Sequence, residues 1–181
     1  MPDRPYQVKG STVRSKLDFV HEQFGAEARA ALEARFSGRG LLPILVSGWY
    51  DYDLYVEVIE AIATIHFGSD LSRLAAVGAY SAEQSLRTVY AAFVRSTGFV
   101  EFLRGISRLH HMFYNVGRLD VEVAADRHSC TITHREKPRL SEADLWVASG
   151  FYKKAGELHG LDSVACEFEI ADTDARFTLR W

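Results

Sequence analysis

The sequence predicts an α+β fold in which N-terminal helices pack on a four-stranded antiparallel sheet, with one helix between the two hairpins. Three observations predict it. Apolar residues recur at helical spacing from Val13 to about residue 114. Beyond Gly117 the apolar period changes to two, as in strands with one buried face. The second half then follows the order hairpin, helix, hairpin, which favours an antiparallel sheet covered by helices.

Five helices are expected before Gly117. Ser11, Asp53 and Asp70 each stand directly before an apolar helical stripe, so we expect them to cap the first, third and fourth helices. Glycines mark most of the ends, because glycine commonly terminates a helix. The expected helical spans are residues 11–25, 26–36, 53–68, 70–95 and 99–116.

Four strands are expected after Gly117. Ser141 and Asp144 resemble a capping pair for the helix between the two hairpins, and Gly160 is expected to end that helix. Cys130 and Cys166 each follow strand-like alternation, so we expect buried free thiols. The expected strands lie near residues 119–125, 129–135, 162–170 and 175–181.

Length and charge limit the function classes. A chain of 181 residues is long enough for one substantial core and too short for two, so we expect a single domain over residues 1–181. The net charge of −3 gives no electrostatic reason to expect nucleic acid or an anionic membrane. No apolar run approaches the roughly 20 residues that span a bilayer, and the opening segment MPDRPYQVKG lacks the apolar part of a signal peptide. The sequence therefore predicts a cytoplasmic protein.

Motifs that support catalysis are missing. The chain has no G-x-S-x-G, P-loop, dinucleotide-binding or H-E-x-x-H pattern. Asp51 and Asp53 flank a tyrosine, and their roles as a helix cap and as part of a solvated turn explain this acidic pair without a catalytic function. Glu167 and Glu169 share the outer face of a strand, and the aromatic run that begins at Trp49 fits a core better than a ligand pocket. We therefore expect that the protein is not an enzyme.

A histidine lies in an apolar helix face. In the segment 99–114, FVEFLRGISRLHHMFY, His110 falls near the middle of the apolar arc, whereas His111 falls toward the polar side. A neutral imidazole in an apolar space is a good metal ligand and a poor filler. Two interpretations follow: a core histidine bonded to a nearby carbonyl, or an axial ligand to haem iron. The arc consists of Phe99, Phe102, Leu103, Ile106, Leu109, Phe113 and Tyr114.

Three blocks of residues carry a family resemblance. The first runs from Val8-Lys-Gly10 to Phe24-Gly25, the second is Gly48-Trp-Tyr50 with Asp53-Leu-Tyr55, and the third is Cys166-x-Phe168 and Arg176-Phe177 with the terminal Trp181. In this order the chain resembles a family of uncharacterised myxobacterial paralogues. That family belongs to a superfamily with H-NOX haem sensors and 4-vinyl-reductase-type ligand-binding domains. The second cysteine of the 4-vinyl-reductase-type ending is missing here, so the resemblance implies no cysteine-bound metal.

The resemblance implies a haem site. H-NOX domains hold haem through a histidine on such a helix, with a V-x-F-L segment ahead of it, and Val100-Glu-Phe102-Leu103 precedes His110 at matching spacing. The implied proximal wall is Leu103, Ile106, Leu109, Phe113 and Tyr114, and the implied distal residues are Val13 and Leu17.

The same family clamps the haem propionates with a Tyr-x-Ser-x-Arg motif. The matching stretch 133–138 has neither the tyrosine nor the serine. Arg135 or Arg139 is left as the partner of a propionate, although neither fits the register of the motif.

Two functions follow from these observations. The first is a non-catalytic sensor or small-molecule-binding domain, whose pocket lies between the helical part and the sheet and takes haem or another hydrophobic molecule. The second is a protein-interaction module with a filled core and no cofactor, because relatives in the superfamily include subunits of vesicle-tethering complexes. A homodimer is expected, since domains of the superfamily often pair.

Overall fold

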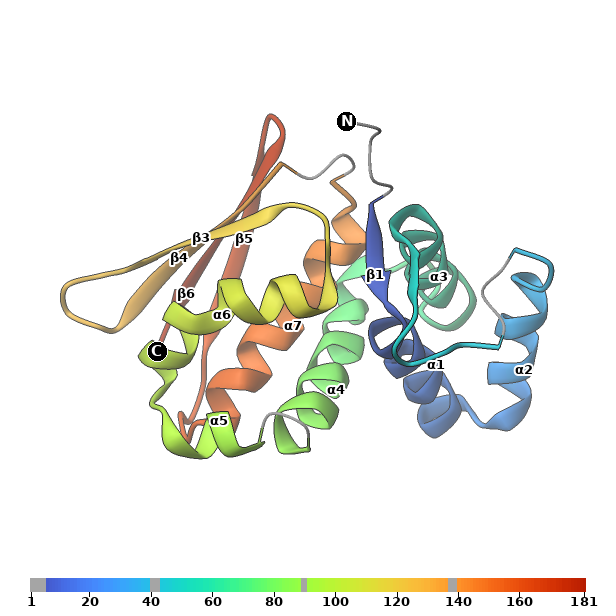
Figure 1. Ribbon diagram of the computed structural model, residues 1–181, viewed down its shortest axis with the longest axis horizontal. Helices are drawn as coiled ribbons and strands as arrows, with labels where there is room; N and C mark the ends of the chain where they lie inside the picture. Colours follow the sequence, from blue (N-terminus) through green and yellow to red (C-terminus); the bar gives the residue numbers. More distant parts are fainter. Residues whose placement is uncertain (1–5, 40–42, 89–90, 137–139) are drawn as a thin grey trace.

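The fold is α+β. The helices of residues 10–66, called the helical part below, lie at one end of the molecule, and the four-stranded sheet lies at the other (Figure 1). The computed structural model describes residues 6–39, 43–88, 91–136 and 140–181. The helices are α1 (Gly10–Phe24), α2 (Ala26–Arg35), α3 (Tyr52–His66), the 3₁₀ helix η1 (Leu71–Arg73), α4 (Leu74–Arg87), α5 (Ala91–Ser96), α6 (Phe99–Phe113) and α7 (Glu142–Leu158). The strands are β1 (Gln7–Lys9), β2 (Trp49–Asp51), β3 (Arg118–Val123), β4 (Ser129–Arg135), β5 (Ala165–Ala171) and β6 (Asp174–Arg180). The predicted fold class is therefore confirmed.

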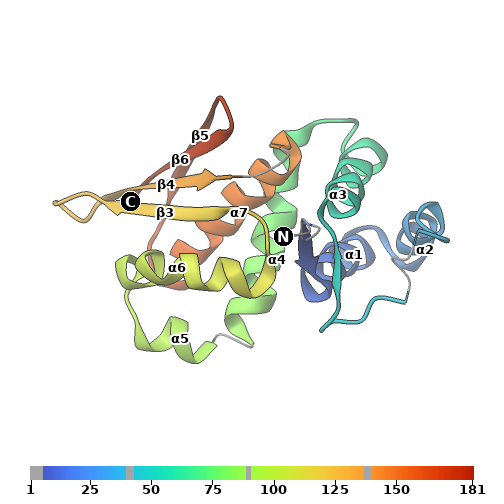
Figure 2. The same cartoon turned by 45° about the horizontal axis from the view of Figure 1, so that its top comes forward.

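The main sheet has the order β3-β4-β6-β5, and every neighbouring pair is antiparallel. Helices α6 and α7 lie along one face, as the turned view makes clear (Figure 2). That face is apolar: Ile132 and Phe177 are paired across the two central strands and are fully buried. The opposite face carries ion pairs, among them Arg176 with Glu169 at 3.0 Å. One face of the sheet is thus buried and the other is solvated, as period-two strands require.

Strands β1 and β2 form a second, two-stranded sheet that the sequence did not predict. Each has three residues, which is too short for an alternation to be recognised. This small sheet brings the chain before α1 next to the chain before α3. It also receives the end of α6, because Val8 forms an isolated bridge with Tyr114.

The expected helix caps need three corrections. Helix α1 begins at Gly10, so Ser11 lies inside its first turn. Asp51, rather than Asp53, caps α3 by accepting a hydrogen bond from the backbone N–H of Leu54 at 3.1 Å. Ser141 occupies the cap position of α7, but its hydroxyl donates to Glu60 and not to the helix backbone.

Asp70 does cap, but it caps η1 instead of one long helix. Its carboxylate accepts from the backbone N–H of Ser72 at 3.0 Å. The expected helix 70–95 is divided into η1, α4 and α5, since α4 ends at Arg87. Strand β5 starts at Ala165, three residues later than the expected start at residue 162.

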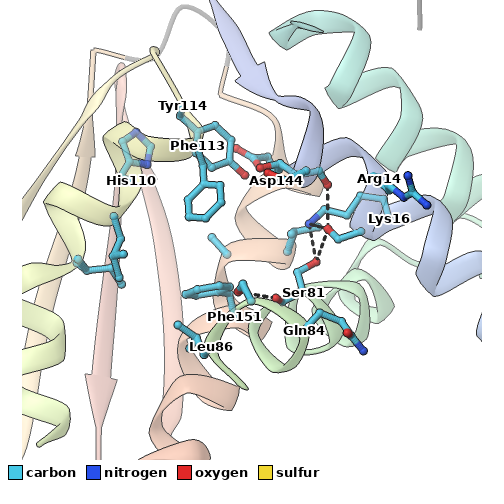
Figure 3. A pocket seen from close by; sticks show the side chains of 18 of the residues that line it. Arg14, Lys16, Ser81, Gln84, Leu86, His110, Phe113, Tyr114, Asp144 and Phe151 are labelled. Carbon is cyan, nitrogen blue, oxygen red and sulfur yellow. Dashed lines mark hydrogen bonds between the residues drawn. The ribbon is translucent and has the colours of Figure 1, made fainter. Parts of the chain in front are cut away.

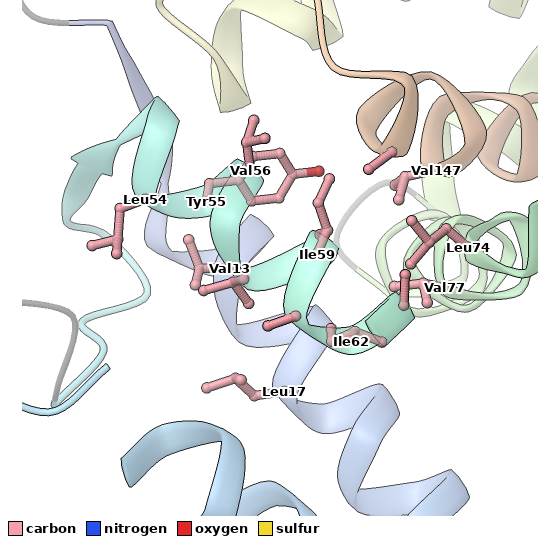
Figure 4. Packing of buried hydrophobic residues seen from close by; sticks show 14 of the residues in the cluster. Val13, Leu17, Leu54, Tyr55, Val56, Ile59, Ile62, Leu74, Val77 and Val147 are labelled. Atoms are coloured by element: carbon pink, nitrogen blue, oxygen red, sulfur yellow. The ribbon is translucent and has the colours of Figure 1, made fainter. Parts of the chain in front are cut away.

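Buried apolar residues form two clusters instead of the single core expected from the chain length. The first gathers around α3 and includes Val13 and Leu17 of α1 (Figure 4). The second lies between the sheet, α6 and α7, and includes Phe102 and Phe177. Helices α4 and α7 contribute residues to both clusters.

Helices α4 and α7 cross at two glycines. A Cβ atom built on Gly78 would lie 1.8 Å from the backbone oxygen of Val147, and one built on Gly150 would lie 1.8 Å from that of Ala75. Real Cβ atoms do not approach a backbone oxygen so closely, so only glycine permits this separation of the two helix axes. The close approach fixes the positions of α4 and α7 relative to each other. None of the described helices is both long and apolar enough to cross a membrane.

Candidate ligand-binding pocket

A pocket of about 450 Å³ lies where the two apolar clusters meet. Its walls come from α1, α4, α6 and α7 and from the β3–β4 end of the sheet (Figure 3). The volume is in the range of sites that bind small molecules or cofactors. Its position between the helical part and the sheet is the one predicted from the sequence.

One side of the pocket is apolar. The side chains come from four elements that the fold brings together: the end of α4, the second half of α6, the start of β3 and the middle of α7. The residues are Leu86, Ile106, Leu109, Phe113, Leu119 and Phe151. Such a surface can bind the apolar part of a ligand in many orientations, because the hydrophobic effect is not directional.

The opposite side is polar and comes from α1 and α4. Thr12, Ser15 and Lys16 lie on one face of α1 because of their helical spacing, and Ser81 and Ser85 lie on the facing side of α4. The hydroxyls of Ser15 and Ser81 are 3.1 Å apart. The two helices thus present a strip of hydroxyl groups with one amine among them.

That amine, Lys16, is only 2% exposed. Its Nζ donates to Ser81 Oγ at 2.7 Å and, more weakly, to Ser15 Oγ at 3.4 Å. Burial lowers the pKa of Lys16 to about 8, because the charged form loses hydration, while the negative charge of Asp144 acts in the opposite direction. A buried ammonium held mainly by hydroxyl groups is costly, and such groups are concentrated at functional sites.

Asp144 lies at the inner end of the pocket and connects α3 with α7. Its carboxylate accepts from the hydroxyl of Tyr52 at 2.9 Å and from that of Tyr55 at 3.1 Å. Burial and then nearby charge raise the pKa values of both tyrosines, so both stay protonated donors. The buried carboxylate is therefore satisfied by two neutral donors.

His110 lies in the wall contributed by α6. Its Nε2 is 2.8 Å from the backbone oxygen of Val116, so Nε2 carries the proton and donates to that carbonyl. The ring stacks on Tyr114, with centroids 5.0 Å apart and an interplanar angle of 8°. His134 of β4 approaches from the sheet at 6.2 Å between centroids, and its Nε2 is 2.7 Å from the hydroxyl of Tyr152.

The structure brings together five of the nine predicted site residues. These are Ile106, Leu109, His110, Phe113 and Tyr114, which all line the pocket. Leu103 is on the same helix but is fully buried in the cluster against the sheet.

The expected distal residues lie elsewhere. Val13 and Leu17 face α3 in the first cluster, so the pocket face of α1 is the neighbouring one that carries Lys16. Arg135 does not line the pocket, because its guanidinium pairs with Asp120 and with Asp174 on the sheet. Arg139 lies outside the described residues.

Sequence reasoning missed Lys16 and its hydroxyl partners. One signal was present: at roughly 100° per residue, Lys16 falls only about 70° from the middle of the apolar stripe of α1. A lysine so near a buried stripe is unusual. Ser81 carried no comparable signal, because its role depends on α4 crossing α1.

Known proteins were compared with this chain by sequence and by structure. No family model matches the sequence, and no curated protein matches it. Solved structures of H-NOX proteins match nearly the whole chain. One is the unliganded Fe(II) H-NOX protein from K. algicida, with a TM-score of 0.75, 16% identity and coverage of 95% of each chain.

Two other matches have similar extent. The H-NOX protein from S. oneidensis in the Fe(II)NO state has a TM-score of 0.77 and 9% identity, over 95% of this chain and 98% of that one. An oxygen-binding H-NOX domain related to soluble guanylate cyclases has a TM-score of 0.67 and 15% identity, over 95% and 93%. The chain therefore has the H-NOX fold.

Proposed function

We propose that this chain is a single, non-catalytic sensor domain that binds a hydrophobic cofactor, haem, in the pocket between its helical part and its sheet. The observation that carries the proposal is the 450 Å³ pocket with His110 in its wall, within an H-NOX fold. The matched H-NOX protein from K. algicida contains Fe(II), that from S. oneidensis contains Fe(II) with NO, and the domain related to soluble guanylate cyclases is an oxygen complex. The interaction-module alternative requires a filled core, and the pocket between the two apolar clusters favours the ligand-binding function over it.

The surroundings of His110 fit an axial ligand. A histidine that binds a metal almost always donates its other ring N–H to a carbonyl or carboxylate. Here Nε2 donates to the Val116 carbonyl, so the hydrogen bond fixes the tautomer and holds the ring in the pocket wall. Haem held by His110 would supply iron for the binding of a small gas molecule. Among the described residues no group of three or more His, Cys, Asp or Glu side chains could hold a metal ion, and the proposal assigns the haem iron to His110.

The propionate end departs from the H-NOX pattern. Arg135, the expected partner, is held by two carboxylates on the sheet. Among the described residues that line the pocket, the cationic side chains besides the histidines are Arg14 and Lys16. Haem carboxylates would therefore meet the α1 side of the pocket.

The finer assignments are also proposals. Membership of the myxobacterial paralogues, and the link to 4-vinyl-reductase-type domains, are supported by the three sequence blocks. The sensor assignment supports a signalling role, and the sequence, in which no apolar run is long enough to span a bilayer, supports a cytoplasmic location. A homodimer is supported by a small set of exposed apolar side chains around β2: Leu45, Val46 and Trp49.

Absorption spectroscopy tests the haem proposal. The purified protein, supplemented with haem, is expected to show a Soret band. His110→Ala should remove the band while circular dichroism keeps its native form, and His111→Ala should leave it unchanged, since His111 is exposed. A wild-type protein that stays colourless after supplementation would overturn the proposal, and an unchanged band in His110→Ala would overturn the ligand assignment.

A further inference from the structure

We infer that Lys16, together with the hydroxyls of Ser15 and Ser81, forms a carboxylate-binding subsite, so that the ligand of the pocket carries a carboxylate on an apolar body. The inference rests on the proposed function and adds the ligand class. Figure 3 shows Lys16 and Ser81 on the opposite side of the pocket from His110 and Phe113.

The hydrogen bonds of Lys16 leave room for a ligand. An ammonium group has three N–H donors. Lys16 uses two of them, on Ser81 Oγ at 2.7 Å and Ser15 Oγ at 3.4 Å. Its Nζ also lies 6.0 Å from the centroid of the Tyr55 ring, and Lys16 lines the pocket. A charged donor at a pocket wall binds an anionic acceptor most strongly.

The two serines are already oriented by their own helices. Ser15 Oγ donates to the backbone oxygen of Thr12 at 2.9 Å, and Ser81 Oγ donates to that of Val77 at 2.9 Å. With their protons so directed, the hydroxyls offer lone pairs to Lys16 and keep its Nζ at the pocket wall. A purely structural role for this position does not need a charge, since a neutral side chain would avoid the desolvation.

The other charged groups of the pocket do not compete for this position. Asp18 is paired with Arg14 at 3.7 Å and with Arg29 at 2.6 Å. Asp144 accepts from two tyrosine hydroxyls at the inner end, and its negative charge partly offsets the lowering of the Lys16 pKa by burial. His110 and His134 face the pocket from the opposite side. A ligand carboxylate therefore has Lys16 as its buried cationic partner.

The rest of the pocket defines the body of the ligand. From Ser81 the wall of α4 continues to Leu86 and meets Phe151 and Ile106, all apolar. The ligand is thus amphipathic, with its carboxylate at α1 and its apolar body against α6 and α7. A propionate of haem and the carboxylate of a free fatty acid both satisfy this chemistry.

Two pairs of probes separate these sources. Haemin is compared with haemin dimethyl ester by the Soret band, and dodecanoate is compared with dodecan-1-ol by calorimetry. Each is measured on the wild type, on Lys16→Met and on Lys154→Met, a control that removes a lysine from the surface of α7, where it pairs with Glu157. Lys16→Met should weaken the binding of the carboxylate probe by at least about tenfold and leave the binding of the ester or alcohol unchanged, because the variant removes the charged donor that binds the carboxylate.

The outcomes distinguish the two proposals. If haemin binding depends on Lys16 and on free propionates, both proposals stand. If only dodecanoate binds, and depends on Lys16, the subsite stands and the haem proposal is wrong. If haemin and its ester bind equally, with and without Lys16, the subsite is wrong and the haem proposal stands. If neither haemin nor dodecanoate binds to the wild type, both are wrong.

Two further measurements guard against misfolding. Ser81→Ala removes one hydroxyl partner without removing the charge, and should weaken dodecanoate binding more than dodecanol binding. In the wild type, dodecanoate affinity should fall as the pH rises above about 8, since Lys16 then loses its proton. The pH range from about 7 to 10 covers the titration of Lys16. An affinity for dodecanoate that does not change over this range would contradict the inference.

Discussion

The hydroxyl of Tyr52 donates to the carboxylate of Asp144 at 2.9 Å, and this hydrogen bond joins α3 to α7 across the inner end of the pocket. Both residues are almost fully buried, and 92 positions separate them in the chain. The bond therefore connects the helical part of the molecule to the helix that covers the sheet.

Tyr52→Phe should destabilise the protein by about 1.5–3 kcal/mol, because it leaves a buried carboxylate with one donor fewer. Urea denaturation measures the change. Tyr80→Phe is the matched control: it removes a Tyr–Glu hydrogen bond of 2.7 Å to Glu22 at an exposed position, which should cost less than about 1 kcal/mol. Equal effects of the two substitutions would contradict a special role for the Tyr52–Asp144 bond.

Lys16→Met should change the pH dependence of stability. The folded pKa of Lys16 is about 8, below the ordinary value of 10.5, so between these values the unfolded chain binds more protons than the folded one. The wild type should therefore gain stability, by up to a few kcal/mol, as the pH rises from 8 to 10.5, relative to Lys16→Met. Thermal unfolding of both proteins across this range provides the comparison, and parallel curves would refute the depressed pKa.

Gly78→Ala and Gly150→Ala should each destabilise the protein by about 1–3 kcal/mol or more, because a methyl group would meet a backbone oxygen of the facing helix at 1.8 Å. Gly98→Ala is the control. Its Cβ would lie 3.0 Å from the flexible carboxylate of Glu101, and Gly98 is the N-cap of α6, where alanine is less favourable than glycine; the substitution should therefore cost about 1 kcal/mol or less. Chemical denaturation that ranks Gly98→Ala with the other two would show that the α4–α7 crossing is adjustable.

Cys130 and Cys166 should stay reduced and react slowly with thiol reagents in the native protein. Both pair with Leu179 of β6 from opposite sides, so two strand spacings, roughly 9–10 Å, separate them, which is too far for a disulfide. Burial also raises the pKa of each thiol to about 11. Mass spectrometry of alkylated samples should find two free thiols, modified quickly only after unfolding; a Cys130–Cys166 disulfide would contradict the register.

Arg135→Ala should leave ligand binding unchanged. Its guanidinium is partly exposed and pairs with Asp120 and Asp174, so its loss should change the stability of the protein little. A titration with haemin or dodecanoate decides the point. A loss of affinity in this variant would restore Arg135 as a carboxylate partner, as the family resemblance first implied.

Long periodic segments allowed much of this fold to be predicted. Helix α6 spans Phe99–Phe113, within the predicted range, and its apolar arc placed His110 correctly toward the interior. The main strands were found within three residues of their bounds, because alternation over six or seven residues is a strong signal.

Other features depend on contacts that the sequence does not display. Asp51 and Asp53 are equally good caps by residue type, and the end of strand β2 decides between them. The polar side of the pocket requires Lys16 of α1 and Ser81 of α4 to meet, although 65 positions separate them. Local periodicity indicates which residues are buried but not which distant helix they face.

The sharing of α4 and α7 by both apolar clusters has a consequence for cooperativity. Neither cluster can open without taking apart helices that the other one needs, so the two should unfold in one transition and not as separate units. A molecule bound in the pocket contacts residues of both helices at the boundary between the clusters. Its binding free energy therefore stabilises the whole chain. The protein should keep a single unfolding transition, and the melting temperature of that transition should rise with ligand concentration.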